Sequence, residues 1–323
     1  MIGTRSRILM VALATAGMTI GYATPASAQA TRTWVSGEGD DVNPCSRTAP
    51  CKTFAGAISK TAAGGEINCL DPGGYGAVTI IKSMTISCPY TEGGALAGGN
   101  GITVNMPAAS DVTFLRGLDI FGVNPPSSGV RFINNGTLHI EDSTIRRFNA
   151  ANSVGVSVSP TGAAKLYITR TTIAENGNGG TGGGVQILPG AGGSVKAVLK
   201  EVRVDNNANN GIRLDSTNGS IGILIEDSQI SGSDQGISTN GGASNLRVMV
   251  EGSSIVHNGF FGIFAVGATT IMRVGDTSIT GNGTGISTVG GAQVISFLTN
   301  RLAGNPTVGA ASDGAFTSTT PQN

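Results

Sequence analysis

Apolar and polar residues alternate in short segments of this chain, and one such segment recurs six or seven times between residues 138 and 305. Its first copy reads Leu138-His-Ile-Glu-Asp-Ser-Thr-Ile145, and Gly155-Val-Ser-Val158 follows after a turn. Alternation with a period of two predicts strands that turn one face inward. Aligned on the last apolar residue of the first phrase, these anchor residues recur every 23 to 31 positions: Ile145, Ile173, Val204, Ile230, Ile255, Ile279 and Leu302. A repeat of this length without a helical pattern predicts stacked β coils.

A polar column stands three positions after the anchors. Coils stacked about 4.8 Å apart would bring its side-chain amides within hydrogen-bonding distance of one another. Asparagine also tolerates the left-handed backbone conformation that tight turns require. We therefore expect a structural ladder, with one serine among its members: Asn176, Asn207, Ser233, Asn258, Asn282 and Asn305.

The first 28 residues have the pattern of a signal peptide. Arg5 and Arg7 precede an apolar run from residue 8 to about residue 20, and Ala26-Ser-Ala28 follows. We expect cleavage after Ala28 and a secreted or periplasmic protein; an uncleaved membrane anchor is the alternative. No later apolar run of the sequence reaches the length of a membrane span.

The composition is that of a solenoid with many tight turns, since 51 of 323 residues are glycine and only 12% are charged. The formal net charge is zero, which gives no electrostatic reason to expect binding to nucleic acid or to an anionic membrane. Nothing in the sequence indicates an oligomeric state.

Four cysteines all lie in the N-terminal quarter, and an even number in an exported chain predicts disulfides. Four cysteines allow three pairings. We favour Cys45–Cys51, which closes a small loop, and Cys69–Cys88, which joins comparable points of two predicted neighbouring strands. Between the two pairs, residues 52–63 are predicted to form an amphipathic helix that covers the open end of the stack and ends at Gly64-Gly65.

Several N-terminal motifs resemble the cap of exported bacterial right-handed parallel β-helix proteins of the pectate-lyase-like superfold: Trp34-Val-Ser-Gly-Glu-Gly-Asp-Asp, Pro50-Cys-Lys-Thr-Phe54-Ala and Asp71-Pro-Gly-Gly-Tyr75-Gly. The resemblance implies an all-β, right-handed parallel β-helix of about ten coils with an N-terminal capping helix. We expect a signal peptide over 1–28, a cap over 29–65, the β-helix over 66–309 and a flexible tail over 310–323. The superfold includes lyases, hydrolases, adhesins and inert scaffolds, so the resemblance specifies no activity.

The resemblance also implies that the phrase before each anchor is the first of three strands per coil, and that its outward side carries the active groove in the family's enzymes. We call this outward side the first-strand face. Counting back six from each anchor predicts an outward column that is mostly apolar: Phe114, His139, Tyr167, Val198, Leu224, Met249, Arg273 and Ser296. Because monomers seldom leave such a stripe bare, we expect a loop, a partner or a saccharide to cover it.

Candidate chemistry on this face comes from charged and aromatic side chains. Arg170 and Lys200 could hold an acidic saccharide, a sugar ring could stack on Tyr167, and Glu226 with Asp227 could bind Ca²⁺ or transfer protons. The simpler interpretation is that these charges are solvated turn residues. The weak catalytic candidates are His139, Arg170, Lys200, Glu226 and Asp227, and the binding candidates are Tyr167, Leu224, Glu141, Glu251 and Arg273.

Two functional hypotheses remain. The first is an exported scaffold that binds saccharide or a cell-surface partner, without turnover and without a cofactor. The second is a degenerate or unrecognised polysaccharide lyase or hydrolase that acts on acidic polysaccharide, for which alone Ca²⁺ would be needed. The sequence lacks the histidine- and arginine-containing motifs of the family's hydrolases and lyases. Their absence favours the scaffold.

Overall fold

The computed structural model describes residues 29–321, except 124, 126, 179–181, 308, 309 and 312. The predicted signal peptide, residues 1–28, lies outside this part of the chain. No helix in the described part is long and apolar enough to cross a membrane.

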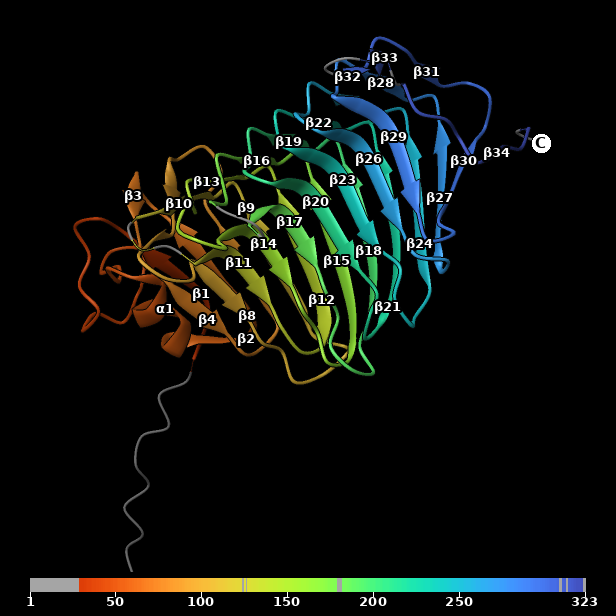
Figure 1. The fold of residues 1–323 in the computed structure, drawn as a ribbon. Helices are drawn as coiled ribbons and strands as arrows, with labels where there is room; N and C mark the ends of the chain where they lie inside the picture. Colours follow the sequence, from red (N-terminus) through yellow and green to blue (C-terminus); the bar gives the residue numbers. More distant parts are fainter. Residues whose placement is uncertain are drawn as a thin grey trace, which may run out of the picture.

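The described residues form three parallel sheets that wind into a rod (Figure 1). The first sheet has twelve strands: β1 (Ala30–Val35), β2 (Thr61–Cys69), β5 (Met84–Ser87), β9 (Val112–Arg116), β12 (Gly136–Glu141), β15 (Ala163–Thr169), β18 (Ser194–Lys200), β21 (Ser220–Glu226), β24 (Leu246–Glu251), β27 (Thr270–Gly275), β30 (Gln293–Ser296) and β34 (Ser318–Thr319).

The second sheet has nine short strands, which contain the anchors: β7 (Leu96–Ala97), β10 (Asp119–Gly122), β13 (Thr144–Arg146), β16 (Thr172–Ala174), β19 (Arg203–Asp205), β22 (Gln229–Ser231), β25 (Ser254–Val256), β28 (Ser278–Thr280) and β31 (Arg301–Leu302). The third also has nine: β4 (Val78–Ile80), β8 (Ile102–Val104), β11 (Ser128–Phe132), β14 (Val154–Val158), β17 (Gly183–Ile187), β20 (Asn210–Asp215), β23 (Gln235–Asn240), β26 (Phe261–Val266) and β29 (Thr284–Val289). Two minor pairs are β3 (Gly73–Gly74) with β6 (Gly93–Gly94), and β32 (Pro306–Thr307) with β33 (Ala310–Ala311).

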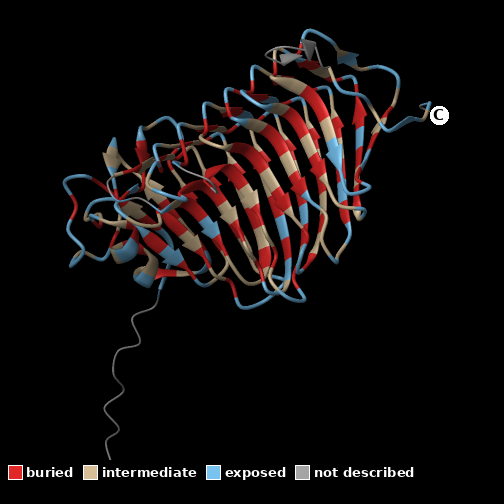
Figure 2. Ribbon diagram, viewed as in Figure 1, coloured by how far each residue is buried: buried red, intermediate tan, exposed pale blue. Residues whose placement is uncertain are grey.

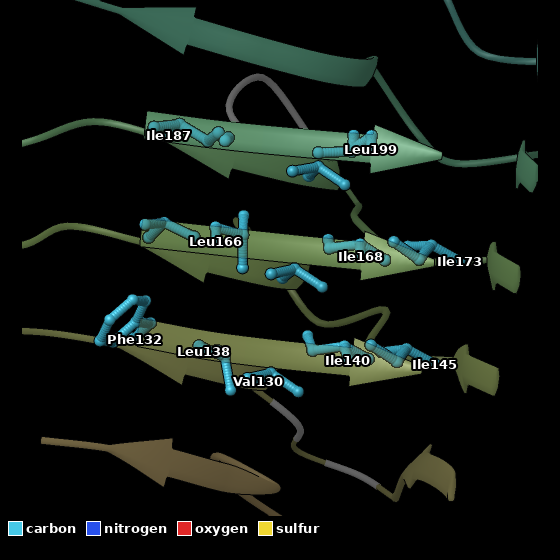
Figure 3. Packing of buried hydrophobic residues seen from close by; sticks show 14 of the residues in the cluster. Val130, Phe132, Leu138, Ile140, Ile145, Leu166, Ile168, Ile173, Ile187 and Leu199 are labelled. Atoms are coloured by element: carbon cyan, nitrogen blue, oxygen red, sulfur yellow. The ribbon is translucent and has the colours of Figure 1, made fainter. Parts of the chain in front are cut away.

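Each strand of the three sheets pairs in parallel with its equivalent one coil away, so the chain is a right-handed parallel β-helix of about nine coils. The predicted class is confirmed. Inward residues stack along the axis: Leu138, Ile140 and Ile145 lie in line with their counterparts in the next coil (Figure 3). All three are fully buried, and a buried residue of this kind contributes roughly 1.5–3 kcal/mol to folding. Buried residues alternate with less buried ones along the strands (Figure 2).

The polar column forms hydrogen bonds between coils. Asn258 Nδ2 donates to Asn282 Oδ1 at 2.8 Å, and Asn282 Nδ2 donates to Asn305 Oδ1 at 2.9 Å. Asn176 donates to Asn207 in the same way. The expectation that these asparagines are themselves left-handed is wrong, because the residue just before each of them has the positive φ: Glu175, Asn206, His257, Gly281 and Gly304.

The cap differs from its predicted bounds. Helix α1 spans only Phe54–Lys60, and the hydroxyl of Thr53 accepts a hydrogen bond from Gly56 N at its start. Thr61 ends the helix because it begins β2, which pairs with β1. The first strand of the large sheet therefore lies within the predicted cap, and the sheet crosses the boundary at residue 65. Both predicted disulfides, Cys45–Cys51 and Cys69–Cys88, are present.

The last coil corrects two further expectations. Arg273 pairs with Ile295, so Ile295 is outward and Ser296 is buried, the reverse of the predicted positions. Ser296 stands six positions before its anchor Leu302, whereas Ile140 stands five positions before Ile145. This extra turn residue shifts the register. The second expectation concerns the flexible tail: within it, strand β34 pairs with β30 and so belongs to the first sheet.

Candidate functional site

The central row of the first-strand face consists of the outward side chains of strands β9 to β27. Strand alternation places them outside, and the pairing register lines them up in order: Phe114, His139, Tyr167, Val198, Leu224, Met249 and Arg273. All are half-buried except Arg273, which is exposed. Because partners in the register of a sheet lie about 4.8 Å apart, these side chains form a ridge along the rod.

Three aromatic rings begin this row as a stack. The ring centroids of Phe114 and His139 are 4.4 Å apart, and those of His139 and Tyr167 are 4.7 Å apart, with nearly parallel planes. One face of Tyr167 is thus covered by His139, and Val198 lies beside it in the next coil. Sugar stacking on Tyr167 stays a prediction, and the face of the ring that His139 covers is not open to it.

The environment of His139 affects its protonation. Burial lowers the pKa of His139 below its ordinary value; Glu141 opposes this shift and Arg116 supports it. Its Nδ1 lies 3.8 Å from Glu141 Oε1, and its side chain is 24% exposed. The imidazole is therefore neutral at pH 7 and can accept a proton, although both faces of its ring are in the stack.

A charged row flanks the ridge on the side of the first turn. Here the structure brings together the other catalytic candidates, but as ion pairs between coils. Arg170 binds Asp142 through two nitrogens at 2.6 and 2.9 Å. Lys200 Nζ lies 3.0 Å from Glu226 and 3.7 Å from Asp227.

These contacts also fix the protonation of the basic groups. Hydrogen bonding to Asp142 raises the pKa of Arg170, and hydrogen bonding to Glu226 raises the pKa of Lys200. Both side chains stay charged at neutral pH, so neither serves as a proton acceptor in this arrangement. Glu141 is held by Arg116 at 2.8 Å, and Glu251 lies beside Glu226 in the next coil.

The proposed Ca²⁺ ligands do not fit a calcium site. Ca²⁺ takes six to eight oxygen ligands in proteins, several of them carboxylates. Glu226 and Asp227 both face Lys200, and the described residues contain no group of three or more His, Cys, Asp or Glu side chains that could hold a metal ion. We derive no step through Ca²⁺.

A row of basic residues on the opposite flank of the ridge was not predicted from the sequence. Lys165 and Lys196 lie directly opposite each other in neighbouring strands, and both are exposed. No carboxylate of the described residues forms an ion pair with either. Arg247 continues the row and donates to the carbonyl of Thr269 at 2.8 Å. The repeat could have predicted this row, because Lys165, Lys196 and Arg247 each stand eight positions before an anchor.

Comparisons with known proteins agree with the fold. The family model described as "Right handed beta helix region" matches residues 100–271. Among solved structures, pectate lyase Pel9A aligns with a TM-score of 0.61 at 16% identity, over 84% of this chain and 76% of the other. A rhamnogalacturonan lyase aligns with a TM-score of 0.54 at 14% identity, over 82% and 75%. No curated protein matches the sequence. At these identities the two lyases show the fold alone.

Proposed function

The chain belongs to the right-handed β-helix family, and from this premise we propose that it is an exported scaffold that binds an extended saccharide chain along the first-strand face without turning it over. The observation that carries this proposal is the half-buried apolar ridge between two charged rows: two lysines that form no ion pair with a carboxylate of the described residues, and a row of ion-paired charges. Two disulfides support an oxidising compartment outside the cytoplasm.

The dimensions of the ridge suit a polymer. From Phe114 to Met249 the row crosses five coil steps, which is about 24 Å at a spacing of about 4.8 Å. A chain that lies along the rod meets an equivalent position in every coil. Apolar contact with ring edges and aliphatic side chains would supply affinity, and it would also cover a stripe that monomers seldom leave bare.

The two flanks indicate how charge is distributed on the ligand. Three basic residues on the first-turn flank oppose seven acidic ones, which leaves a net charge of −4: Arg116, Arg170 and Lys200 against Glu141, Asp142, Glu201, Glu226, Asp227, Glu251 and Asp276. Lys165 and Lys196 on the other flank lack such compensation. The ligand is therefore a saccharide whose acidic groups face the lysines.

The alternative is a lyase or hydrolase that acts on acidic polysaccharide in the same place. One observation favours it: neutral His139 stacks on Tyr167 of the next coil, and Lys165, which stands two residues before Tyr167, lies on the same face. The ion pairing of Arg170 and Lys200 argues against it, since those cations are already occupied.

Binding and turnover can be measured separately on one sample. We expect hexagalacturonate, the probe, to bind in a calorimetric titration, and we expect Lys165→Gln with Lys196→Gln to weaken binding by about tenfold or more. Lys52→Gln, an exposed lysine of the cap, is the matched control and should bind as the wild type does. Ultraviolet absorbance and reducing-end assays on the same mixture should detect no unsaturated or shortened product. Product formation would establish the enzyme instead, and an unaffected double variant would exclude the lysine flank.

A further inference from the structure

A hollow on the outer side of the third sheet lies away from the first-strand face. It measures about 370 Å³ and spans β20, β23 and β26, which face the viewer in Figure 1. The polar residues that line it include Asn209, Asn210, Arg213, Gln235 and Asn240. A second hollow of about 530 Å³ shares Asn209 with it. Small-molecule sites in proteins occupy about 300–1,000 Å³, so the size suits a small ligand.

Three buried amide atoms of residues at this hollow have no hydrogen-bond partner among the described residues: Asn209 Nδ2, Asn210 Oδ1 and Gln235 Oε1. Asn210 is only 5% exposed, and it pairs in register with Gln235. Folded proteins leave few buried polar atoms unpaired, because such atoms lose their bonds to bulk water. The three atoms are themselves buried, so a bound molecule reaches this one donor and these two acceptors only if the amide groups rotate toward the hollow.

An aromatic pair adjoins these amides one coil further on. Phe261 is the register partner of Gln235, and its ring stacks on Phe264 with centroids 4.8 Å apart. Phe264 itself lines the hollow. Both rings are half-buried, and the neighbouring Phe260 is 61% exposed. An apolar wall thus stands beside the unpaired amides.

The charges at the hollow cancel. Arg213 lies 3.5 Å from Asp215, and Asn240 Nδ2 donates to Asp215 at 3.1 Å. Burial acts to raise the pKa of Asp215, but the hydrogen bonds that it accepts from Thr217 and Asn240 outweigh burial and lower it. Asp215 therefore remains ionised and neutralises Arg213, so the hollow favours neither an anion nor a cation.

We propose that this hollow is a second binding site, for an uncharged, hydroxyl-rich ligand such as a pyranose unit of a neutral saccharide. Each sugar hydroxyl can donate one hydrogen bond and accept others, so neighbouring hydroxyls can satisfy one donor and two acceptors together. The apolar C–H face of the sugar can lie against Phe264.

The test is calorimetric titration of the full chain with neutral probes: glucose, galactose, mannose, maltohexaose and cellohexaose. We expect at least one of them to bind, and we expect Phe264→Ala and Gln235→Leu each to weaken that binding by about tenfold or more. The Lys165→Gln, Lys196→Gln variant of the first-strand face should bind the neutral probe unchanged. The proposals for the two sites can thus be refuted independently of each other.

Melting curves distinguish a ligand site from a structural role. Because Gln235 Oε1 has no hydrogen-bond partner in the described part of the chain, Gln235→Leu should melt at the same temperature as the wild type or higher. A fall of several degrees would show that Gln235 stabilises the fold, and it would overturn the proposal. Binding of none of the neutral probes, or binding that both third-sheet variants retain in full, would overturn it as well.

Discussion

Removal of the Asn258 side chain tests how much the ladder contributes to the stability of the coil. Its Oδ1 accepts a hydrogen bond from Ser233 N at 3.2 Å, and its Nδ2 donates to Asn282 Oδ1 at 2.8 Å and to Ile230 O at 3.4 Å. The residue is 1% exposed. Asn258→Ala therefore removes two well-formed bonds and one long bond from the interior.

The expected cost follows from these contacts. Two good hydrogen bonds contribute about 1 kcal/mol each, and the loss of its acceptor leaves Ser233 N buried without a partner, which costs about 1–3 kcal/mol. The bond from Ser233 N enters both estimates, so they overlap. We expect a decrease of about 2–4 kcal/mol in the free energy of unfolding.

Urea unfolding followed by circular dichroism measures this difference, and hydrogen exchange shows whether β22, β25 and β28 open first, as a local loss requires. Exchange is needed because coils of a solenoid need not unfold together. Asn218→Ala is the control, since Asn218 is exposed, and it should change stability by no more than about 0.5 kcal/mol. Equal losses for the two variants would refute a stabilising ladder.

Three further predictions concern the rest of the rod. Ser233 Oγ is buried without a hydrogen-bond partner among the described residues, at a place where the column otherwise has asparagine, so Ser233→Asn should stabilise by about 1 kcal/mol in urea unfolding, and an unchanged or lower midpoint would contradict this. The folded-state pKa of His139 lies below its unfolded-state value, so the stability that neutral His139 contributes is present above the unfolded-state pKa and is lost as the pH falls from there through the folded-state pKa. His139→Phe should therefore reduce the loss of stability between about pH 7.5 and pH 5, and identical pH profiles for the variant and the wild type would oppose this. Reduction of Cys45–Cys51 and Cys69–Cys88 should increase hydrogen exchange in β1, β2 and β5 before other strands, whereas a uniform increase would argue against a local role.

Regular features of the coil could be predicted from the sequence because each repeat faces the same environment. An inward residue must be apolar in every coil, which is why Ile140 and Ile168 identify the strand and its register. The same logic failed in the last coil, where one extra residue in the turn moved Ser296 to the inside. Counting from an anchor works only while turn lengths stay constant.

Features that depend on side-chain conformation were harder to predict. The sequence shows Arg170 and Lys200 on the first-strand face, but not that carboxylates of adjacent coils already neutralise them. A second ladder was missed for a similar reason. In the first turn, Ser228 N donates to Ser253 Oγ, and Ser253 N donates to Thr277 Oγ1, but serine and threonine are so common in turns that this column gave no distinct signal.

The unpaired amides at the third sheet also could not be predicted. Asn210 and Gln235 look like ordinary polar residues at the start of a strand. Their burial beside Phe261 and Phe264 depends on how three consecutive coils pack. Only the three-dimensional packing of the described residues decides which of their atoms lack hydrogen-bond partners.

Titration of hexagalacturonate into the Tyr167→Ala, Leu224→Ser double variant tests the central claim most directly, namely that the ridge of the first-strand face binds the saccharide. Both side chains are half-buried on the outer side of the first sheet and lie outside the buried core. We predict an affinity at least about tenfold below that of the wild type, with a melting temperature within a few degrees of it. Wild-type affinity in a folded double variant would contradict the account.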